Sequence, residues 1–202
     1  MKFADDLKRS VNFGRNGLRF HVSLSFQLSS SFYKLRSDMP DKAGGCLCGA
    51  NRYAVSTNPV RVTFCHCRFC QRATGSAYLV EPIFDRDSLR MLTGSPSTYE
   101  HRSEGSGKLV TINFCATCGT KLFLEFERFS GVVGVYGGTF DDPNWFQRTP
   151  ENSKHIFLSV AQNGTVIPPG FDTFQQHAIL TDGGPVNAKV FDAPYIVKSR
   201  HE

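Results

Sequence analysis

The chain has 202 residues, of which 40% are hydrophobic and 20% charged, and this ordinary globular usage excludes a fully disordered or fibrous protein. Its length suits one domain with a single core. The formal net charge is +5, but residues 1–43 hold eight basic and four acidic side chains and so carry most of it. The rest of the chain is almost neutral, with no clustered basic face and no apolar run of about 18 residues. We therefore expect no nucleic-acid partner and no membrane partner.

Residues 1–43 differ in composition from the remainder, because they contain no cysteine and are rich in Ser and Arg. Three interpretations compete: an organellar transit peptide, an additional strand over residues 21–28, or a start placed too far upstream, with Met39 as the true start. We favour the third, because Asp5 and Asp6 weaken the transit interpretation and Met39 stands shortly before the first cysteines. The expected division is an N-terminal extension over 1–43, disordered or wrongly assigned, and a zinc-binding domain over 44–197. No signal-peptide core is visible, which predicts a cytoplasmic location.

The composition predicts a mainly β fold, because 18 Phe, 18 Gly and 10 Pro favour short strands and turns over long helices. Alternating apolar patterns predict strands over residues 51–55, 62–64, 77–80, 109–114, 121–126, 132–136, 156–160 and 190–197. Short helices are expected over residues 68–73 and 143–146, each too brief to be stable outside the fold. The aromatic residues expected in the core are Tyr99, Phe123, Phe126, Phe140 and Phe157.

The seven cysteines all lie between residues 46 and 118, in three groups: Cys46 and Cys48; Cys65, Cys67 and Cys70; Cys115 and Cys118. A disulfide framework is disfavoured, because the odd number leaves one free thiol and the chain is long enough to build its own core. Thiolates two or three positions apart suit tetrahedral Zn²⁺, since the intervening turn lets both sulfurs approach one metal at about 2.3 Å. The cysteine pattern therefore predicts metal binding.

The number seven divides naturally into four and three, because a closed structural zinc site takes four ligands and a catalytic site takes three plus an open position. Cys65, Cys67 and Cys70 lie within six residues, so one loop can present all three to a catalytic zinc. The remaining four then form a structural zinc site that joins two distant segments: Cys46, Cys48, Cys115 and Cys118. We thus expect two zinc ions per chain, one structural and one catalytic.

Three neighbours of the cysteines bear on this assignment. Gly49 and Gly119 each follow a cysteine pair directly, as the tight turn of a metal-binding knuckle requires. His66 lies between Cys65 and Cys67 and is able to replace one thiolate as a ligand. Because the two flanking side chains must converge, we expect His66 outside the ligand set, either behind it or facing solvent.

The three cysteine groups stand in characteristic surroundings, which read GCLCGA over residues 45–50, CHCRFCQRATGS over 65–76 and FCATCGT over 114–120. A fourth segment, over residues 138–143, reads GTFDDP. With these motifs the chain resembles the glutathione-dependent formaldehyde-activating enzyme (GFA) and centromere-protein-V family over about residues 44–160. The resemblance implies a GFA-like β-tent of short antiparallel sheets around two zinc sites. It also implies that the four-cysteine site is structural and that Cys65, Cys67 and Cys70 are the catalytic residues.

The family's reference activity joins the glutathione thiol to formaldehyde and gives S-hydroxymethylglutathione, which is a carbon–sulfur lyase reaction in reverse. The resemblance therefore implies a zinc-dependent lyase whose partner is a small-molecule thiol such as glutathione. Arg68 and Arg72 are candidate substrate-binding residues, because guanidinium groups beside the thiolates would offset negative charge and pair with carboxylates; the alternative places both in solvent. The alternative function is a non-catalytic zinc-binding protein with a structural or partner-binding role.

Overall fold

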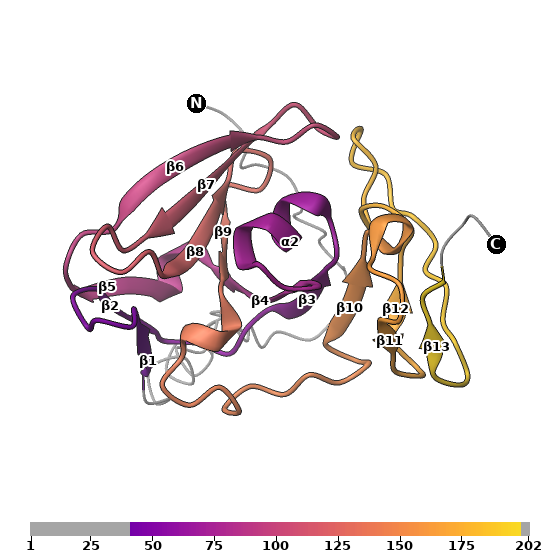
Figure 1. The fold of residues 1–202 in the computed structure, drawn as a ribbon, viewed down its shortest axis with the longest axis horizontal. Coiled ribbons are helices and arrows are strands. Elements are labelled where there is room, and N and C mark those ends of the chain that lie inside the picture. Colours follow the sequence, from indigo (N-terminus) through magenta and orange to yellow (C-terminus); the bar gives the residue numbers. More distant parts are fainter. Residues whose placement is uncertain (1–40, 199–202) are drawn as a thin grey trace, which may run out of the picture.

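The computed structural model describes residues 41–198, and its largest element is one twisted sheet (Figure 1). The strands of this sheet are β3 (Arg61–Cys65), β4 (Leu79–Asp85), β6 (Ser97–Arg102), β7 (Leu109–Phe114), β8 (Lys121–Phe126), β9 (Val132–Val135), β10 (Ser153–Ile156) and β12 (Asp172–Thr173). They lie in the order β12-β10-β3-β4-β9-β8-β7-β6. In the part of this order that runs β3-β4-β9-β8-β7-β6, each strand is antiparallel to the next, whereas β10 is parallel to both β3 and β12. The mainly β fold predicted from the composition is confirmed.

Two smaller sheets flank the large one. The first has three antiparallel strands in the order β1-β2-β5, namely β1 (Lys42–Gly45), β2 (Arg52–Val55) and β5 (Leu89–Thr93). The second pairs β11 (Val166–Ile167) with β13 (Tyr195–Ile196). The helices described are short: α2 (Arg68–Thr74) and three single 3₁₀ turns at Arg86–Ser88, Gly137–Thr139 and Leu158–Val160.

The eight-stranded sheet separates two apolar clusters, as the alternation of side chains along a strand requires. On one face, Val62, Phe84 and Phe123 pack with Tyr53 and Val55 of the three-stranded sheet. On the other face, the sheet packs against α2 and against the chain beyond β12. The buried members of this second cluster are Cys65, Cys70, Leu79, Ile112, Leu124, Tyr136, Ile156, Phe174 and Ala178. Helix α2 thus lies over one face of the sheet, at the end of β3 (Figure 1).

The GTFDDP segment fastens the three-stranded sheet to the rest of the fold. The Tyr53 hydroxyl lies 2.8 Å from Thr139 Oγ1, and Gly44 forms a β-bridge to Phe140. A Cβ at Gly44 would overlap the Tyr53 ring and the Thr139 carbonyl, so this close approach needs glycine. Arg52 and Asp141 add a half-exposed, bidentate ion pair. This segment therefore positions β1, and with it the first cysteine pair.

Several local predictions are wrong, each for a physical reason. Residues 143–146 form turns instead of a helix, because the Asp142 side chain accepts a hydrogen bond from the Asn144 N–H at 2.9 Å. Tyr99 is 58% exposed, since it lies on β6 at the edge of the sheet. The strand predicted over 156–160 ends at Ile156, where Phe157 adopts a left-handed φ of 62°. The strand predicted over 190–197 shortens to Tyr195–Ile196.

The other core aromatics behave as expected: Phe123 and Phe140 are buried, and Phe126 and Phe157 pack partly buried against the second cluster. The expected helix over 68–73 is confirmed as α2. The interpretations offered for residues 1–43, including the Met39 start, stay predictions, because residues 1–40 lie outside the described residues.

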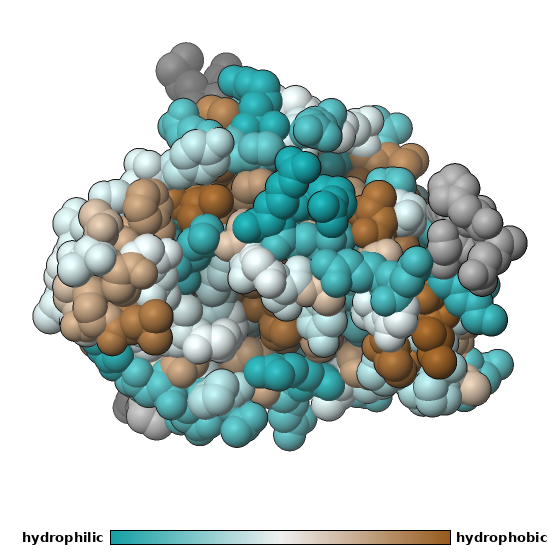
Figure 2. Space-filling view, in the orientation of Figure 1, coloured by the Kyte–Doolittle hydropathy of each residue, from teal (hydrophilic) through white to brown (hydrophobic). Residues whose placement is uncertain are grey.

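Among the described residues, no helix is both long enough and apolar enough to cross a membrane. The face in Figure 2 shows polar side chains interspersed with small apolar groups. Exposed apolar side chains of the two-stranded β11–β13 sheet include Val166 and Ile196, which are 57% and 52% exposed.

Candidate functional site

The four-cysteine cluster joins the turn after β1 to the turn between β7 and β8. The Sγ atoms of Cys46, Cys48, Cys115 and Cys118 all lie within 4.8 Å of one another. Cys48 Sγ is 3.5 Å from Cys46 Sγ and 3.6 Å from Cys115 Sγ. Four sulfurs placed tetrahedrally about 2.3 Å from one zinc ion would be about 3.8 Å apart. The donor set and its spacing therefore fit a closed zinc site.

Two turns of similar construction present these four cysteines. The Cys46 N–H donates to the Asn51 carbonyl at 3.0 Å, and the Cys115 N–H donates to the Thr120 carbonyl at 2.9 Å. Gly49 and Gly119 take left-handed φ values of 75° and 74°, so the tight turns expected at these glycines are present. The Asn51 N–H also donates to Cys46 Sγ at 3.2 Å. These hydrogen bonds and turns orient the cysteine side chains toward one another.

The three-cysteine cluster belongs to the second apolar cluster, where β3 passes into α2, whereas the four-cysteine cluster borders the first. Cys65 ends β3, Cys67 is the N-cap of α2, and Cys70 lies one turn into the helix. Their Sγ atoms lie within 4.8 Å of one another, with Cys65 Sγ 3.5 Å from Cys67 Sγ. The Cys70 N–H donates to Cys67 Sγ at 3.3 Å, as a capping group requires. Three converging sulfurs fit the ligand set of an open zinc site.

The three thiols of this cluster differ in acidity. Hydrogen bonds from the Cys65 and Cys70 thiols, together with backbone N–H groups of α2, lower the pKa of Cys67. The pKa values of Cys65 and Cys70 are raised, mainly because their hydrogens bridge to neighbouring sulfurs and then because both side chains are buried. One thiolate is therefore held between two thiols, a pattern suited to taking up a metal cation with release of the remaining protons.

His66 is fully buried, so it does not face solvent, and it lies outside both groups of converging metal-binding atoms. Its Nε2 lies 3.1 Å from Nδ1 of His155 on β10. Phe64 stacks on the His155 ring at 4.4 Å, and Tyr78 tilts against the His66 ring at 4.9 Å. Burial lowers the pKa of each histidine to about 4, so the pair is neutral at pH 7.

Gln71 connects helix α2 by hydrogen bonds to the turn before the helix and to the 3₁₀ turn Leu158–Val160. The Gln71 amide donates to the His66 carbonyl at 2.6 Å and to the Val160 carbonyl at 2.9 Å. Its oxygen accepts a hydrogen bond from Arg68. Of the two arginines predicted to bind substrate, Arg68 therefore already has a partner within the helix, and both are exposed. Their role in binding remains a prediction.

Two further residues beside the three-cysteine cluster escaped the sequence analysis. Glu81 of β4 is 6% exposed, and Tyr136, directly after β9, is 7% exposed. Burial raises the pKa of Glu81 to about 8, with the charge of Cys67 adding to the effect. The pKa of Tyr136 is also raised, first by burial and then by the charges of Cys70, Glu81 and Cys67. The only sequence signal for Glu81 was an acid inside an otherwise apolar stretch, LVEPIF.

A mainly β domain with one four-cysteine and one three-cysteine cluster defines a class, that of small cysteine-rich β domains whose cysteine clusters could hold metal ions. Within that class, residues 41–160 match the family described as glutathione-dependent formaldehyde-activating enzyme, and the chain belongs to this family. A crystal structure of a protein from Rhodobacter sphaeroides is also similar, with 21% sequence identity and a TM-score of 0.41. That likeness covers 49% of this chain and 87% of the other.

Proposed function

We propose that the protein is a zinc-dependent carbon–sulfur lyase of the GFA type. In this proposal it condenses a thiol, in the first place glutathione, with formaldehyde or a related aldehyde to give an S-hydroxymethyl adduct in the cytoplasm. The observation that carries the proposal is the convergence of Cys65, Cys67 and Cys70 within 4.8 Å, with no fourth metal-binding side chain in that group among the described residues. Membership of the family supports the same reaction class.

The two clusters are proposed to have different tasks. The four-cysteine cluster supplies a complete tetrahedral donor set. It also joins two turns that are distant in sequence, since 67 residues separate Cys48 from Cys115. Its zinc is therefore structural. The three-cysteine cluster leaves one position for substrate, so its zinc is catalytic. When bound there, zinc would supply the acidity and the orientation that turn a substrate thiol into a reactive thiolate at neutral pH.

The chain's own residues shape this site in three ways. The α2 backbone fixes Cys67 and Cys70 through the cap, and the His66–His155 pair and Gln71 hold the turn that contains them. Apolar neighbours such as Leu79 and Ile156 limit the access of water to the sulfurs. We propose that Arg72, on the exposed side of α2, pairs with a carboxylate of the thiol substrate, and that Arg68 contributes positive charge beside it.

The reaction itself is an addition. The substrate sulfur loses its proton and forms a bond to the aldehyde carbon, while the carbon–oxygen double bond becomes a single bond. The oxygen then takes up one proton, so the adduct contains all the atoms of thiol and aldehyde and no electrons are gained or lost.

The test combines metal content with activity. Protein purified without chelator is analysed for zinc, and adduct formation from glutathione and formaldehyde is compared with the spontaneous rate. Two zinc ions per chain and catalysis above the spontaneous rate are expected. Two zinc ions without rate enhancement would favour the non-catalytic alternative or another thiol. One zinc ion would contradict the catalytic role of the three-cysteine cluster.

A further inference from the structure

Two buried oxygen atoms beside the three-cysteine cluster have no hydrogen-bond partner among the described residues. They are Oε1 of Glu81 and the hydroxyl oxygen of Tyr136, and both side chains are more than nine-tenths buried. A buried polar atom without a partner costs about 1–3 kcal/mol, and most native proteins avoid it. Two such atoms in one place indicate a missing polar partner.

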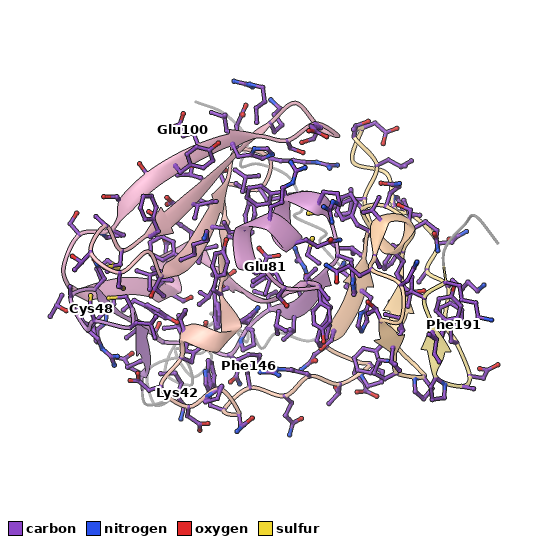
Figure 3. The ribbon with its side chains drawn as sticks, in the orientation of Figure 1. Lys42, Cys48, Glu81, Glu100, Phe146 and Phe191 are labelled. Carbon is purple, nitrogen blue, oxygen red and sulfur yellow. The ribbon has the colours of Figure 1, made fainter. Side chains whose placement is uncertain are left out.

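The strand register places Glu81 on the same face as the reactive cysteines. Cys65 pairs with Leu79, and Thr63 pairs with Glu81, so Cys65, Leu79 and Glu81 all point to the α2 side of the sheet. Figure 3 shows Glu81 on β4 beside α2, and the two elements are in contact.

Tyr136 reaches the same space from β9. It packs with Cys65, Cys70 and Leu79 in one apolar cluster. Glu81 and Tyr136 nevertheless form no hydrogen bond to each other, since both atoms are unpartnered. Both atoms therefore still have the capacity to bind a polar group beside the apolar cluster that contains Cys65 and Cys70.

The space for the Glu81 carboxyl is built into the neighbouring strand. A Cβ at Gly134, on β9, would overlap Oε1 of Glu81, so the carboxyl occupies room that only glycine provides. The positive charge of Arg61 lowers the pKa of Glu81, but less than burial raises it. The Nε atom of Arg61 is also buried without a hydrogen-bond partner, so among the described residues no ion pair holds the carboxyl.

We propose that Glu81 and Tyr136 bind the oxygen atom of the aldehyde, while the three-cysteine cluster holds the reacting sulfur. This inference rests on the proposed function and assigns residues for its second substrate. As the sulfur–carbon bond forms, the aldehyde oxygen gains negative charge, and then accepts the proton lost by the thiol. Hydrogen bonds from Tyr136 and the carboxyl stabilise that oxygen more strongly in the transition state than in the free aldehyde.

The closing experiment measures kinetics and stability of three full-length, zinc-loaded variants: Tyr136→Phe, Glu81→Leu and Glu81→Gln. We expect Tyr136→Phe and Glu81→Leu to lower kcat/KM for the aldehyde by roughly tenfold or more, with the KM for the thiol unchanged. Glu81→Gln retains a donor and should recover part of the activity. Because each replaced group is unpartnered, Tyr136→Phe and Glu81→Leu should unfold at the same or a higher temperature than the wild type.

Tyr53→Phe is the matched control, because it removes a buried tyrosine hydroxyl that has a partner and lies on the other side of the sheet. It should lower the unfolding temperature and leave both KM values unchanged. If the wild type is active and Tyr136→Phe and Glu81→Leu have the same kcat/KM for the aldehyde as the wild type, this inference alone is overturned. It is also overturned if the variants lose activity only because they are less stable. A wild type that does not catalyse adduct formation would overturn the proposed function, and this inference with it.

Discussion

Nε2 of His66 and Nδ1 of His155 lie 3.1 Å apart in the protein interior, although 89 residues separate them in the chain. One ring belongs to the turn that presents Cys65 and Cys67, and the other to β10, which is parallel to β3. The backbone N–H of His66 donates a hydrogen bond to the carbonyl oxygen of Ile156, next to His155, at 3.0 Å. The cysteine turn is thus fastened to the sheet by both a side chain and the backbone.

The histidine pair predicts a loss of stability in acid. In the folded protein burial lowers the pKa of both rings to about 4, whereas an unfolded histidine titrates near pH 6.5. Below pH 6.5 the unfolded state therefore binds more protons than the folded state. The neutral rings make their full contribution to the free energy of unfolding above pH 6.5. This contribution declines as the pH falls toward 4, by up to about 1.4 kcal/mol per pH unit for each ring.

Urea unfolding at pH 7, 6 and 5, with zinc content followed at each pH, measures this slope. His155→Asn keeps a hydrogen-bonding group near the position of Nδ1 but cannot titrate. The slope of its unfolding free energy against pH should therefore correspond to about one fewer proton taken up on unfolding. An equal slope in wild type and variant would assign the acid sensitivity to the cysteines instead.

The two cysteine clusters should respond differently to mutation. Cys118→Ser removes a ligand from the closed four-cysteine set, and because the binding free energy of structural zinc is folding free energy, metal and fold should be lost together. Cys67→Ser should leave a folded protein with one zinc ion fewer and no catalysis. Zinc analysis and circular dichroism of both variants provide the measurement. If Cys67→Ser unfolds the protein as severely as Cys118→Ser, the division into structural and catalytic sites is wrong.

Local patterns were sufficient for part of the fold and for the grouping of the cysteines. Strands β7 and β8 have the bounds predicted from alternating apolar residues, because both are interior strands of the sheet. The seven cysteines were assigned to two groups from spacing alone, and the structure brings the same two groups together. In both cases the determining signal lies within a few residues of sequence.

Features that depend on distant partners could not be predicted in this way. Strand β6 reads STYEHR and has no apolar alternation; it exists because it pairs with β7 over six residues. Strand β1 contains two glycines and forms against β2, where Gly44 fits beneath Tyr53. Likewise, nothing near His66 in the sequence indicates His155, and nothing near Glu81 indicates that it faces the cysteines. These relationships follow from register across the sheet.

Gln71 should position the three-cysteine cluster. Gln71→Leu removes the two hydrogen bonds donated to the carbonyls of His66 and Val160, and also those that the Gln71 oxygen accepts from Arg68 and Gln162. We expect a loss of about 2 kcal/mol in stability. The zinc of the three-cysteine cluster should become easier to remove by a chelator, while the zinc of the four-cysteine cluster is retained. Urea unfolding and chelator titration test both points. Gln176→Leu is the control, because it removes only an exposed hydrogen bond to Ser159. Equal behaviour of the two variants would contradict a positioning role for Gln71.

Arg72 is expected to recognise a carboxylate of the thiol substrate. It lies in the last turn of α2, on the exposed side of the helix, whereas Arg68 donates to Gln71. Because an exposed ion pair is weakened by solvent, Arg72→Ala should raise the KM for glutathione by only about three- to tenfold. The KM for 2-mercaptoethanol, which has no carboxylate, should not change. Arg90→Ala is the control, since Arg90 pairs with Asp41 beside the three-stranded sheet. An unchanged KM for glutathione in Arg72→Ala would remove this residue from the substrate-binding site.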